Sequence, residues 1–257
     1  MSMTSRLIYL SLMSLGLSGC GDSHPRLIFS LSSSLPGASS LGVPASGVRA
    51  MTDPASPPEI TSGDGLRFWL DTAVVSVADI RLELGEGLTC EDVREELPEG
   101  AGCVQSGDAP STVTLAGPFF IDLDSGVSSQ GEKELRIPPG KYRRIDFVLW
   151  EGGFKASTRL ERGSQSWTMK LTLPEGTALG FEVPYALAVE EGGSLRVTFR
   201  QSTWLKDLPL GACLQSGDLP QTDSEVILNA ATGECQGAGD TVREALRTQG
   251  ALGARPF

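Results

Sequence analysis

From Leu66 to Phe199 the chain alternates repeatedly between apolar and polar residues. A period of two sends successive side chains to opposite faces of a β-strand, so each segment should bury one face and expose the other. Turn signals rich in Gly and Pro separate the segments, as at Pro138-Pro139-Gly140 and Glu151-Gly152-Gly153. The pattern predicts a mostly β domain, an antiparallel β-sandwich or barrel. The positions expected to share a buried face are Leu66, Phe68 and Leu70; Ile80, Leu82 and Leu84; Ile145, Phe147 and Leu149; Trp167, Met169, Leu171 and Leu173; and Leu195, Val197 and Phe199. Phe120-Ile121-Asp122-Leu123 is expected to form a further short strand.

The C-terminal part of the chain has a different pattern. Residues 225–229 are expected to add one more strand. Beyond them, Thr241 and Glu244 have the spacing of a helix capping box, with Thr241 at the N-cap. Gly250 is expected to end this short C-terminal helix, which should pack on the surface of the sandwich.

The first nineteen residues have the layout of an export signal. Arg6 precedes an apolar run from Leu7 to Leu17, and small residues at 18 and 19 lead to Cys20. A basic start, an apolar run of about 7–15 residues and small residues at the cleavage site are typical of exported chains. A membrane-spanning helix would need about 20 apolar residues. Residues 1–19 are therefore predicted to be a signal peptide; an apolar segment buried in the fold is the alternative.

Leu17-Ser18-Gly19-Cys20 also resembles the lipobox of bacterial lipoproteins. The resemblance implies a thioether-linked diacylglycerol on Cys20, cleavage before it, and acylation of the new N-terminus by a fatty acid such as palmitate. It further implies attachment to a membrane of the cell envelope. Gly21, rather than Asp, follows the cysteine, which favours the outer membrane. The alternative is an ordinary secretory signal that ends near a cysteine.

Residues 20–60 are predicted to form a disordered tether, because the stretch from Ser30 to Pro58 is rich in Ser, Pro, Gly and Ala. A flexible coil of this length would span roughly 30 Å between the lipid and the domain. The more apolar residues 26–29 interrupt this composition. They are expected either to lie at the bilayer surface or to dock on the domain, and the sequence leaves both open.

Four cysteines remain once Cys20 carries the lipid: Cys90, Cys103, Cys213 and Cys235. An even number in an exported chain indicates disulfides. Of the three possible pairings, Cys90–Cys103 and Cys213–Cys235 are favoured, because each pair brackets a Gly- and Asp-containing stretch typical of a long loop. A four-thiolate zinc site is the rival, but the spacing lacks the close pairs that zinc ribbons use.

Residues 66–204 resemble the β-sandwich domains of bacterial envelope lipoproteins, some of which have transthyretin-like or immunoglobulin-like topology. The resemblance rests on residues 73–82, 120–123 and 137–145. In the last segment Gly140 is expected to supply a positive φ to the turn, and Tyr142 to cover the corner. The resemblance implies a fold and a location but no active site. The expected division is a sandwich over 61–206 and a disulfide-containing extension over 207–257.

The net charge and the single histidine argue against several classes of function. The formal net charge of −11 repels phosphates, so nucleic acid is not an expected partner. His24 is the only histidine and lies in the predicted tether, so Ser-His-Asp catalysis, Cys-His catalysis and histidine-bound metals are not expected in the domain. No cofactor and no metal are predicted. The leading hypothesis is a lipid-anchored envelope protein, not an enzyme, which binds an envelope protein or glycan or has a structural role.

Two alternatives use the remaining side chains. Asp122 and Asp124 resemble the start of a calcium loop, but Lys133 occupies the twelfth position, where such a loop needs Glu; Glu132 and Glu134 lie nearby. A carbohydrate-binding module would use exposed aromatic residues. A hydrolase based on two close carboxylates is a further, weaker alternative. The candidate aromatic residues are Trp69, Trp150, Trp167 and Trp204, of which Trp150 is expected to be exposed and Trp167 to be in the core.

Overall fold

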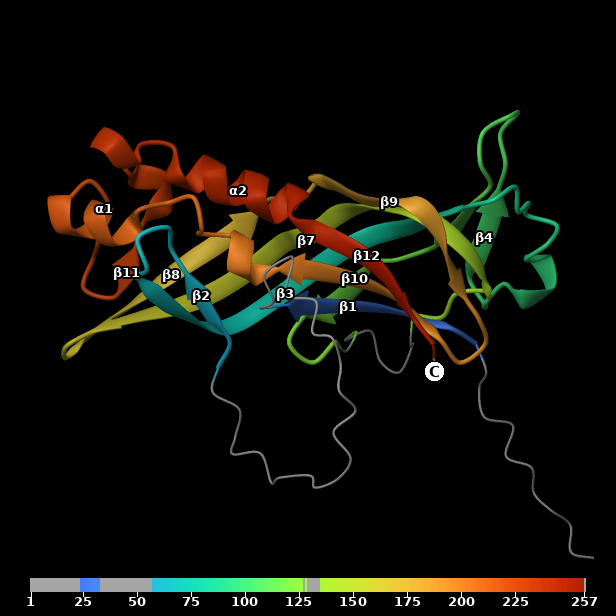
Figure 1. The fold of residues 1–257 in the computed structure, drawn as a ribbon, viewed down its shortest axis with the longest axis horizontal. Coiled ribbons are helices and arrows are strands. Elements are labelled where there is room, and N and C mark those ends of the chain that lie inside the picture. Colours follow the sequence, from blue (N-terminus) through green and yellow to red (C-terminus); the bar gives the residue numbers. More distant parts are fainter. Residues whose placement is uncertain (1–23, 33–56, 127, 129–134, 257) are drawn as a thin grey trace, which may run out of the picture.

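The computed structural model describes residues 24–32, 57–126, 128 and 135–256, which form two packed β-sheets and a set of short helices (Figure 1). The fold is the predicted mostly β sandwich with a short C-terminal helix. The small sheet has the order β1-β10-β12, and the large sheet runs β11-β8-β7-β3-β5-β4, with β2 and β6 also paired to β3 and β9 to β7. The strands are β1 (Arg26–Ser32), β2 (Glu59–Thr61), β3 (Arg67–Leu84), β4 (Ala101–Val104), β5 (Thr112–Leu115), β6 (Phe119–Asp122), β7 (Gly140–Arg162), β8 (Gln165–Leu173), β9 (Ala178–Val189), β10 (Ser194–Arg200), β11 (Glu225–Val226) and β12 (Gly250–Arg255). The helices are η1 (Arg94–Glu96), η2 (Gln201–Thr203), α1 (Leu210–Ser216), η3 (Leu228–Ala230), η4 (Gly233–Cys235) and α2 (Ala238–Thr248).

The alternating segments form strands with the predicted buried faces. Ile80, Leu82, Ile145 and Val197 are fully buried, and the polar residues between them lie on the outer faces. Most strand pairs are antiparallel, as predicted. The pairs β1–β10 and β11–β8 are parallel, which the alternation could not reveal, because a strand alternates in the same way whichever direction its neighbour runs.

Strand β7 passes through Glu151-Gly152-Gly153, where the sequence predicted a turn. Both glycines have positive φ, 89° and 65°, and the register with β3 shifts there: Leu149 pairs with Val77, but Phe154 pairs with Val75. The extra residues on β7 form a wide bulge, and the strand continues beyond it. The prediction of a turn was therefore wrong, because glycines suit a bulge as well as a turn.

At the Pro-Gly corner before β7, the prediction for Tyr142 is confirmed and the prediction for Gly140 is wrong. The ring of Tyr142 is fully buried, and its hydroxyl donates a hydrogen bond to the carbonyl of Pro138, so Tyr142 covers the corner. Burial raises the pKa of this phenol well above its usual range. Gly140 does not have a positive φ, contrary to prediction. A Cβ at this first residue of β7 would make only ordinary contacts, at 3.8 Å, with Leu84 and Tyr142, so neither φ nor space requires glycine there.

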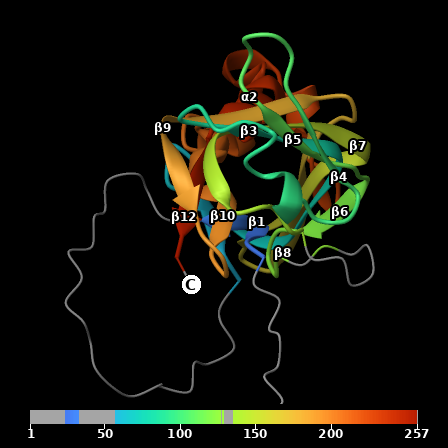
Figure 2. The same cartoon turned by 90° about the vertical axis from the view of Figure 1, so that its right-hand side faces the viewer.

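Aromatic rings connect the two sheets through the core. Viewed along the long axis, the strands of both sheets surround a common centre (Figure 2). Phe29 of the small sheet meets Phe147 of the large sheet edge-on at 5.4 Å, and further ring pairs continue across the interior. These T-shaped and tilted contacts add to the energy of apolar burial. The other pairs are Phe147–Phe181, Phe181–Phe199, Phe154–Phe199 and Phe154–Trp204.

Residues 26–32 belong to the fold, which corrects the prediction of a disordered tether over 20–60. They form β1, which pairs along its whole length with β10, and Leu27 and Phe29 are buried. Of the two open alternatives for residues 26–29, docking on the domain is the one observed. The alternating Leu27, Phe29 and Leu31 supply an apolar face that composition averaged over a long window concealed. Residues 33–56, which join β1 to β2, lie outside the described residues.

The predicted boundary at residue 206 is also wrong, because the C-terminal region supplies strands to both sheets. β11 pairs with β8, although it is shorter than the predicted strand at 225–229 and is followed by η3. β12, which was not predicted, pairs with β10. Its sequence Gly-Ala-Leu-Gly-Ala-Arg has little intrinsic strand signal.

Helix α2 begins four residues earlier than predicted: its N-cap is Gly237, with φ 84°, instead of Thr241, and its first residue is Ala238. Thr241 is therefore inside the helix, where its hydroxyl donates to the carbonyl of Gly237, and Glu244 pairs with Arg247. The capping-box prediction was wrong because the Gly-Ala-Gly segment, expected to precede the helix, forms its start. The helix ends at Thr248, close to Gly250 as predicted, and it packs on β8 and β9.

Candidate functional site

A groove of about 820 Å³ lies between helix α1, the turn that joins β7 to β8, and the start of β3. We call it the distal groove. Its floor is apolar and its rim carries polar side chains. The floor consists of Leu66, Leu160, Trp167 and Leu214, and the rim of Asp64, Arg162, Gln165, Gln215 and Gln221. An apolar floor with a few hydrogen-bonding groups around it is the usual composition of a ligand site.

The distal groove lies at one end of the long axis. Leu66 of its floor directly precedes β3, whose opposite end pairs with β5, and β5 in turn pairs with β4. Figure 1 shows α1 at one end of the molecule and β4 at the other. The groove is therefore remote from the β4 end, which we define as η1, β4 and the residues between them.

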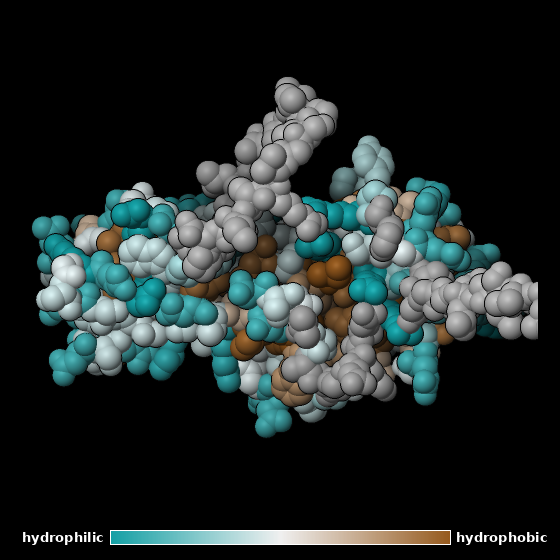
Figure 3. Space-filling model, turned by 90° about the horizontal axis from the view of Figure 1, so that it is seen from below, coloured by the Kyte–Doolittle hydropathy of each residue, from teal (hydrophilic) through white to brown (hydrophobic). Residues whose placement is uncertain are grey.

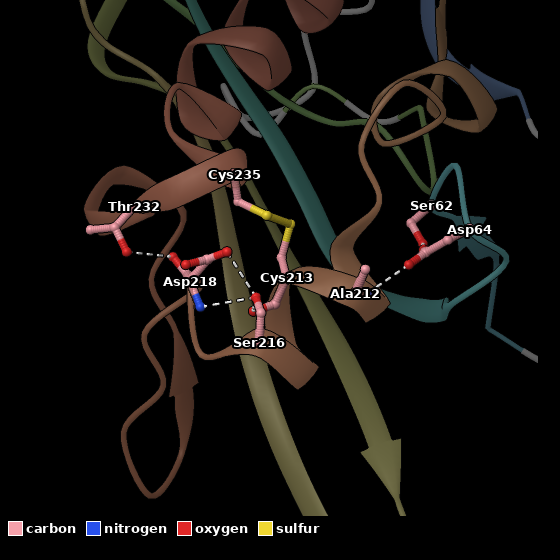
Figure 4. Close-up of a disulfide and its surroundings, with 8 residues drawn as sticks. All are labelled: Ser62, Asp64, Ala212, Cys213, Ser216, Asp218, Thr232 and Cys235. Atoms are coloured by element: carbon pink, nitrogen blue, oxygen red, sulfur yellow. Dashed lines mark hydrogen bonds between the residues drawn. A yellow bond between two sulfur atoms is a disulfide. The ribbon is translucent and has the colours of Figure 1, made fainter.

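A disulfide and a carboxylate fix the position of α1, which forms one wall of the groove (Figure 4). Buried Cys213 within α1 is bonded to Cys235 of η4, with their Cα atoms 5.9 Å apart. On the other side, the carboxylate of Asp64 accepts hydrogen bonds from the Ser62 hydroxyl at 2.5 Å and the Ala212 N–H at 2.8 Å. A helix of only seven residues is not stable alone, so these tertiary contacts hold the wall in place.

The rim carries two charged side chains, and the hydrogen bonds of Asp64 determine its charge. Partial burial raises the pKa of Asp64, but hydrogen bonds from Ser62, Ala212 and Gly211 outweigh this effect, and its pKa lies below the ordinary value. Asp64 is therefore ionised at neutral pH, and its charge is used to cap α1. Arg162, also in the lining, contributes one positive charge. The rest of the rim is neutral amide, which can both donate and accept hydrogen bonds.

The three rim glutamines were not identified from the sequence. Gln165 is the first residue of β8, Gln215 lies in α1 and Gln221 in the loop before β11, and all three are exposed. No spacing links them, because the fold alone brings these segments together. Trp167 was predicted to be in the core, and it is: only 9% of the residue is exposed, at the groove floor.

The structure offers no support for the predicted calcium alternative at the residues it describes. The Asp122 carboxylate accepts hydrogen bonds from the backbone N–H groups of Asp124, at 2.9 Å, and Ser125, at 3.2 Å. It therefore stabilises the turn after β6. Among the described residues, no group of three or more side chains could hold a metal ion. Glu132, Lys133 and Glu134 lie outside the described residues.

The other tryptophans have separate roles. Trp150, predicted to be exposed, is 46% exposed and lies in the β7 bulge beside exposed Val148. Trp204 is fully buried and packs edge-on against Phe154. Trp69 is half-buried on β3. The tryptophans therefore do not form a common binding face; Trp167 is the one that lines the distal groove.

The cysteines pair as the sequence favoured, with Cys90 bonded to Cys103 and Cys213 to Cys235. Cys20, the predicted lipid site, lies outside the described residues. His24 was expected in a tether remote from the domain, but it lines a cavity of about 430 Å³ at the β4 end together with Leu97, Ala101 and Phe119. The folded part of the chain thus contains one imidazole after all.

Carboxylates that approach one another on the outer face of β7 and β9 are engaged in ion pairs. Asp146 accepts two hydrogen bonds from Arg144, at 2.7 and 2.8 Å, and Glu182 accepts one from Arg143 at 3.0 Å. The hydrogen bond and charge of Asp146 raise the pKa of Arg144. These two carboxylates are therefore held by arginine side chains on the surface.

No protein-family model, curated protein or solved structure matches this chain. Within the part of the chain that the structure describes, every helix is too short or too polar to cross a membrane. The function therefore has to be inferred from the chemistry of the distal groove and from the N-terminal sequence.

Proposed function

We propose that this protein is a lipid-anchored, non-enzymatic binding protein of the cell envelope. The anchor is the lipid on Cys20, and its support is Leu17-Ser18-Gly19-Cys20 at the end of an apolar run. Two or more acyl chains are needed for a stable anchor, since each buried methylene contributes about 0.8 kcal/mol and one chain binds only reversibly. The outer membrane is the favoured membrane, because Gly21 follows the cysteine.

The observation that carries the binding role is the distal groove, with Trp167 in its floor and three amides on its rim. An aromatic floor packs against the apolar face of a sugar ring, and amides satisfy its hydroxyl groups in both directions. The charges of Asp64 and Arg162 balance, so a neutral ligand is favoured over a strongly charged one. We propose an envelope glycan as the occupant.

Replacement of the lipid-bearing residue tests the anchor. The wild-type protein should incorporate radioactive palmitate and remain with the membranes, whereas a Cys20→Ser variant should remain unlabelled, because serine has no thiol to form the thioether. Membrane fractionation and palmitate labelling measure both effects. Equal labelling of the two proteins would show that Cys20 is not the acceptor.

Replacement of the rim amides tests the groove. A Gln165→Ala/Gln221→Ala variant should bind soluble, uncharged N-acetylglucosamine oligosaccharides about tenfold more weakly, since two lost hydrogen bonds contribute roughly 1 kcal/mol or more in total. Both side chains are exposed, so folding should not change. Isothermal titration calorimetry measures the affinity, and Trp150→Ala is the control, because Trp150 is an exposed aromatic outside the groove. Unchanged affinity in the double variant, or weakening by the control alone, would contradict the assignment.

A further inference from the structure

The beginning of the described chain lies at the β4 end of the molecule. His24 lines the same cavity as Leu97 and Ala101, which belong to the segment from η1 into β4. Pro25 follows, and its carbonyl accepts a hydrogen bond from the N–H of Ile137. β1 then starts at Arg26, already paired with Ser194 of β10. Residues 24–32 are therefore held by the fold.

Covalent geometry then limits how far Cys20 can be from this end. His24 is the fourth residue after Cys20, and four fully extended residue steps span at most about 14 Å. The Ser/Pro/Gly/Ala-rich residues 33–56 cannot lengthen this connection, because they follow β1 and return to β2, and both strands belong to the fold.

We infer that the β4 end is the membrane-proximal end of the molecule, with His24 held within about 14 Å of the bilayer, and that the distal groove is presented away from it. The inference rests on the proposed lipidation of Cys20. Its partner is the lipid surface, and its consequence is a body that pivots about its β4 end close to the membrane, in place of a freely moving domain on a long tether.

The length of β3 sets the distance between the two ends. This strand runs from the distal groove to the β4–β5 pair, and its eighteen residues span at most about 60 Å. A rigid body that pivots about one end cannot enter the bilayer, so its far end lies on average farther from the membrane than its pivot. The groove is thereby placed where it can bind an envelope glycan that lies away from the anchoring membrane.

The surface of the β4 end fits contact with lipid headgroups better than insertion. Seen from below, both ends of the molecule are mostly hydrophilic, and apolar residues gather near the middle (Figure 3). Between Glu86 and Glu99 the chain has six carboxylates and one arginine. Anionic lipids would repel this segment, and the repulsion would be screened over about 10 Å at 0.1 M salt. Zwitterionic lipid is therefore the appropriate test surface.

Energy transfer to lipid measures the orientation. A clickable amino acid replaces Glu99, at the β4 end, or Ser164, in the turn at the groove rim; both positions are exposed. Each lipidated full-length protein, labelled with a donor dye, is reconstituted into phosphatidylcholine vesicles that contain an acceptor-labelled lipid. The donor at position 99 should be quenched several times more strongly than the donor at position 164. Equal quenching at both positions, or stronger quenching at 164, would overturn the inference.

Insertions at two positions test separately the connection from Cys20 to His24 and residues 33–56, which were predicted to be part of a tether. Ten Gly/Ser residues inserted after Gly21 raise the reach from about 14 to about 50 Å and should reduce quenching at position 99. The same insertion after Gly37 lies beyond β1 and should leave that quenching unchanged. Equal effects of the two insertions would overturn the inference. Mass spectrometry of the same samples distinguishes failure of the proposed lipidation from failure of the proposed orientation. Absence of lipid on Cys20 would overturn both proposals, whereas lipid on Cys20 together with equal quenching would overturn the orientation alone.

Discussion

A Phe29→Ala variant is expected to lose about 3–5 kcal/mol of unfolding free energy. Phe29 is fully buried at the point where β1 meets the large sheet, and its ring contacts Phe147 edge-on at 5.4 Å. Truncation removes the transfer free energy of the ring and leaves a cavity that neighbouring strands cannot fill by moving. Chemical denaturation followed by tryptophan fluorescence measures the loss.

The matched control is Tyr185→Ala, since Tyr185 is 82% exposed and its truncation should change stability by less than about 0.5 kcal/mol. The Phe29→Ala variant also tests the connection between the proposed lipid anchor and the fold. If β1 is weakened, the connection from Cys20 to the fold lengthens, and lipid quenching of a donor at position 99 should fall. A loss below about 1 kcal/mol would mean that β1 contributes little to the fold, in conflict with its burial.

A Gly153→Ala variant is expected to lose at least about 3 kcal/mol, because two independent costs coincide at this position. Its φ of 65° is in the left-handed region, where an L-residue costs roughly 1–2 kcal/mol. In addition, a Cβ at residue 153 would lie 2.1 Å from the carbonyl oxygen of Leu173, so backbone would have to move. Thermal and chemical denaturation both report the loss.

Gly163→Ala isolates the first of these costs. Gly163 has nearly the same φ, 63°, but a Cβ there meets no atom within 4 Å. Its loss should be only about 1–2 kcal/mol. The difference between the two variants measures the steric demand of the β7 bulge against β8. Equal losses would mean that the bulge adapts to a side chain and that the close approach to Leu173 is not a constraint.

The strand predictions succeeded because a two-residue period depends on burial alone. Residues such as Ile80, Leu82 and Leu84 alternate whichever strand becomes their neighbour, so their buried face was predictable before the partner was known. Where two conformations share one local signal, prediction failed. Gly152-Gly153 suits both a turn and a bulge, and the pairing of β7 with β3 on both sides of these glycines selected the bulge.

The distal groove shows a different limit. Its rim glutamines are ordinary polar residues, and the sequence does not indicate that Gln165 and Gln221 face one cavity. Likewise, Asp64 caps a helix 148 residues away, which no local motif could suggest. Contacts between distant segments are decided by packing, since many side chains must fit at once.

By itself the sequence determined the mostly β sandwich, its buried faces, the favoured disulfide pairing and the predicted lipid site, because periodicity, cysteine number and the N-terminal pattern are local properties. Only the tertiary structure decided that β1 belongs to the small sheet, that the C-terminal residues complete both sheets and that the distal groove exists. The physical reason is that these features depend on which apolar faces find each other. For β1, burial of Leu27 and Phe29 against the core outweighs the disorder that the surrounding composition favours.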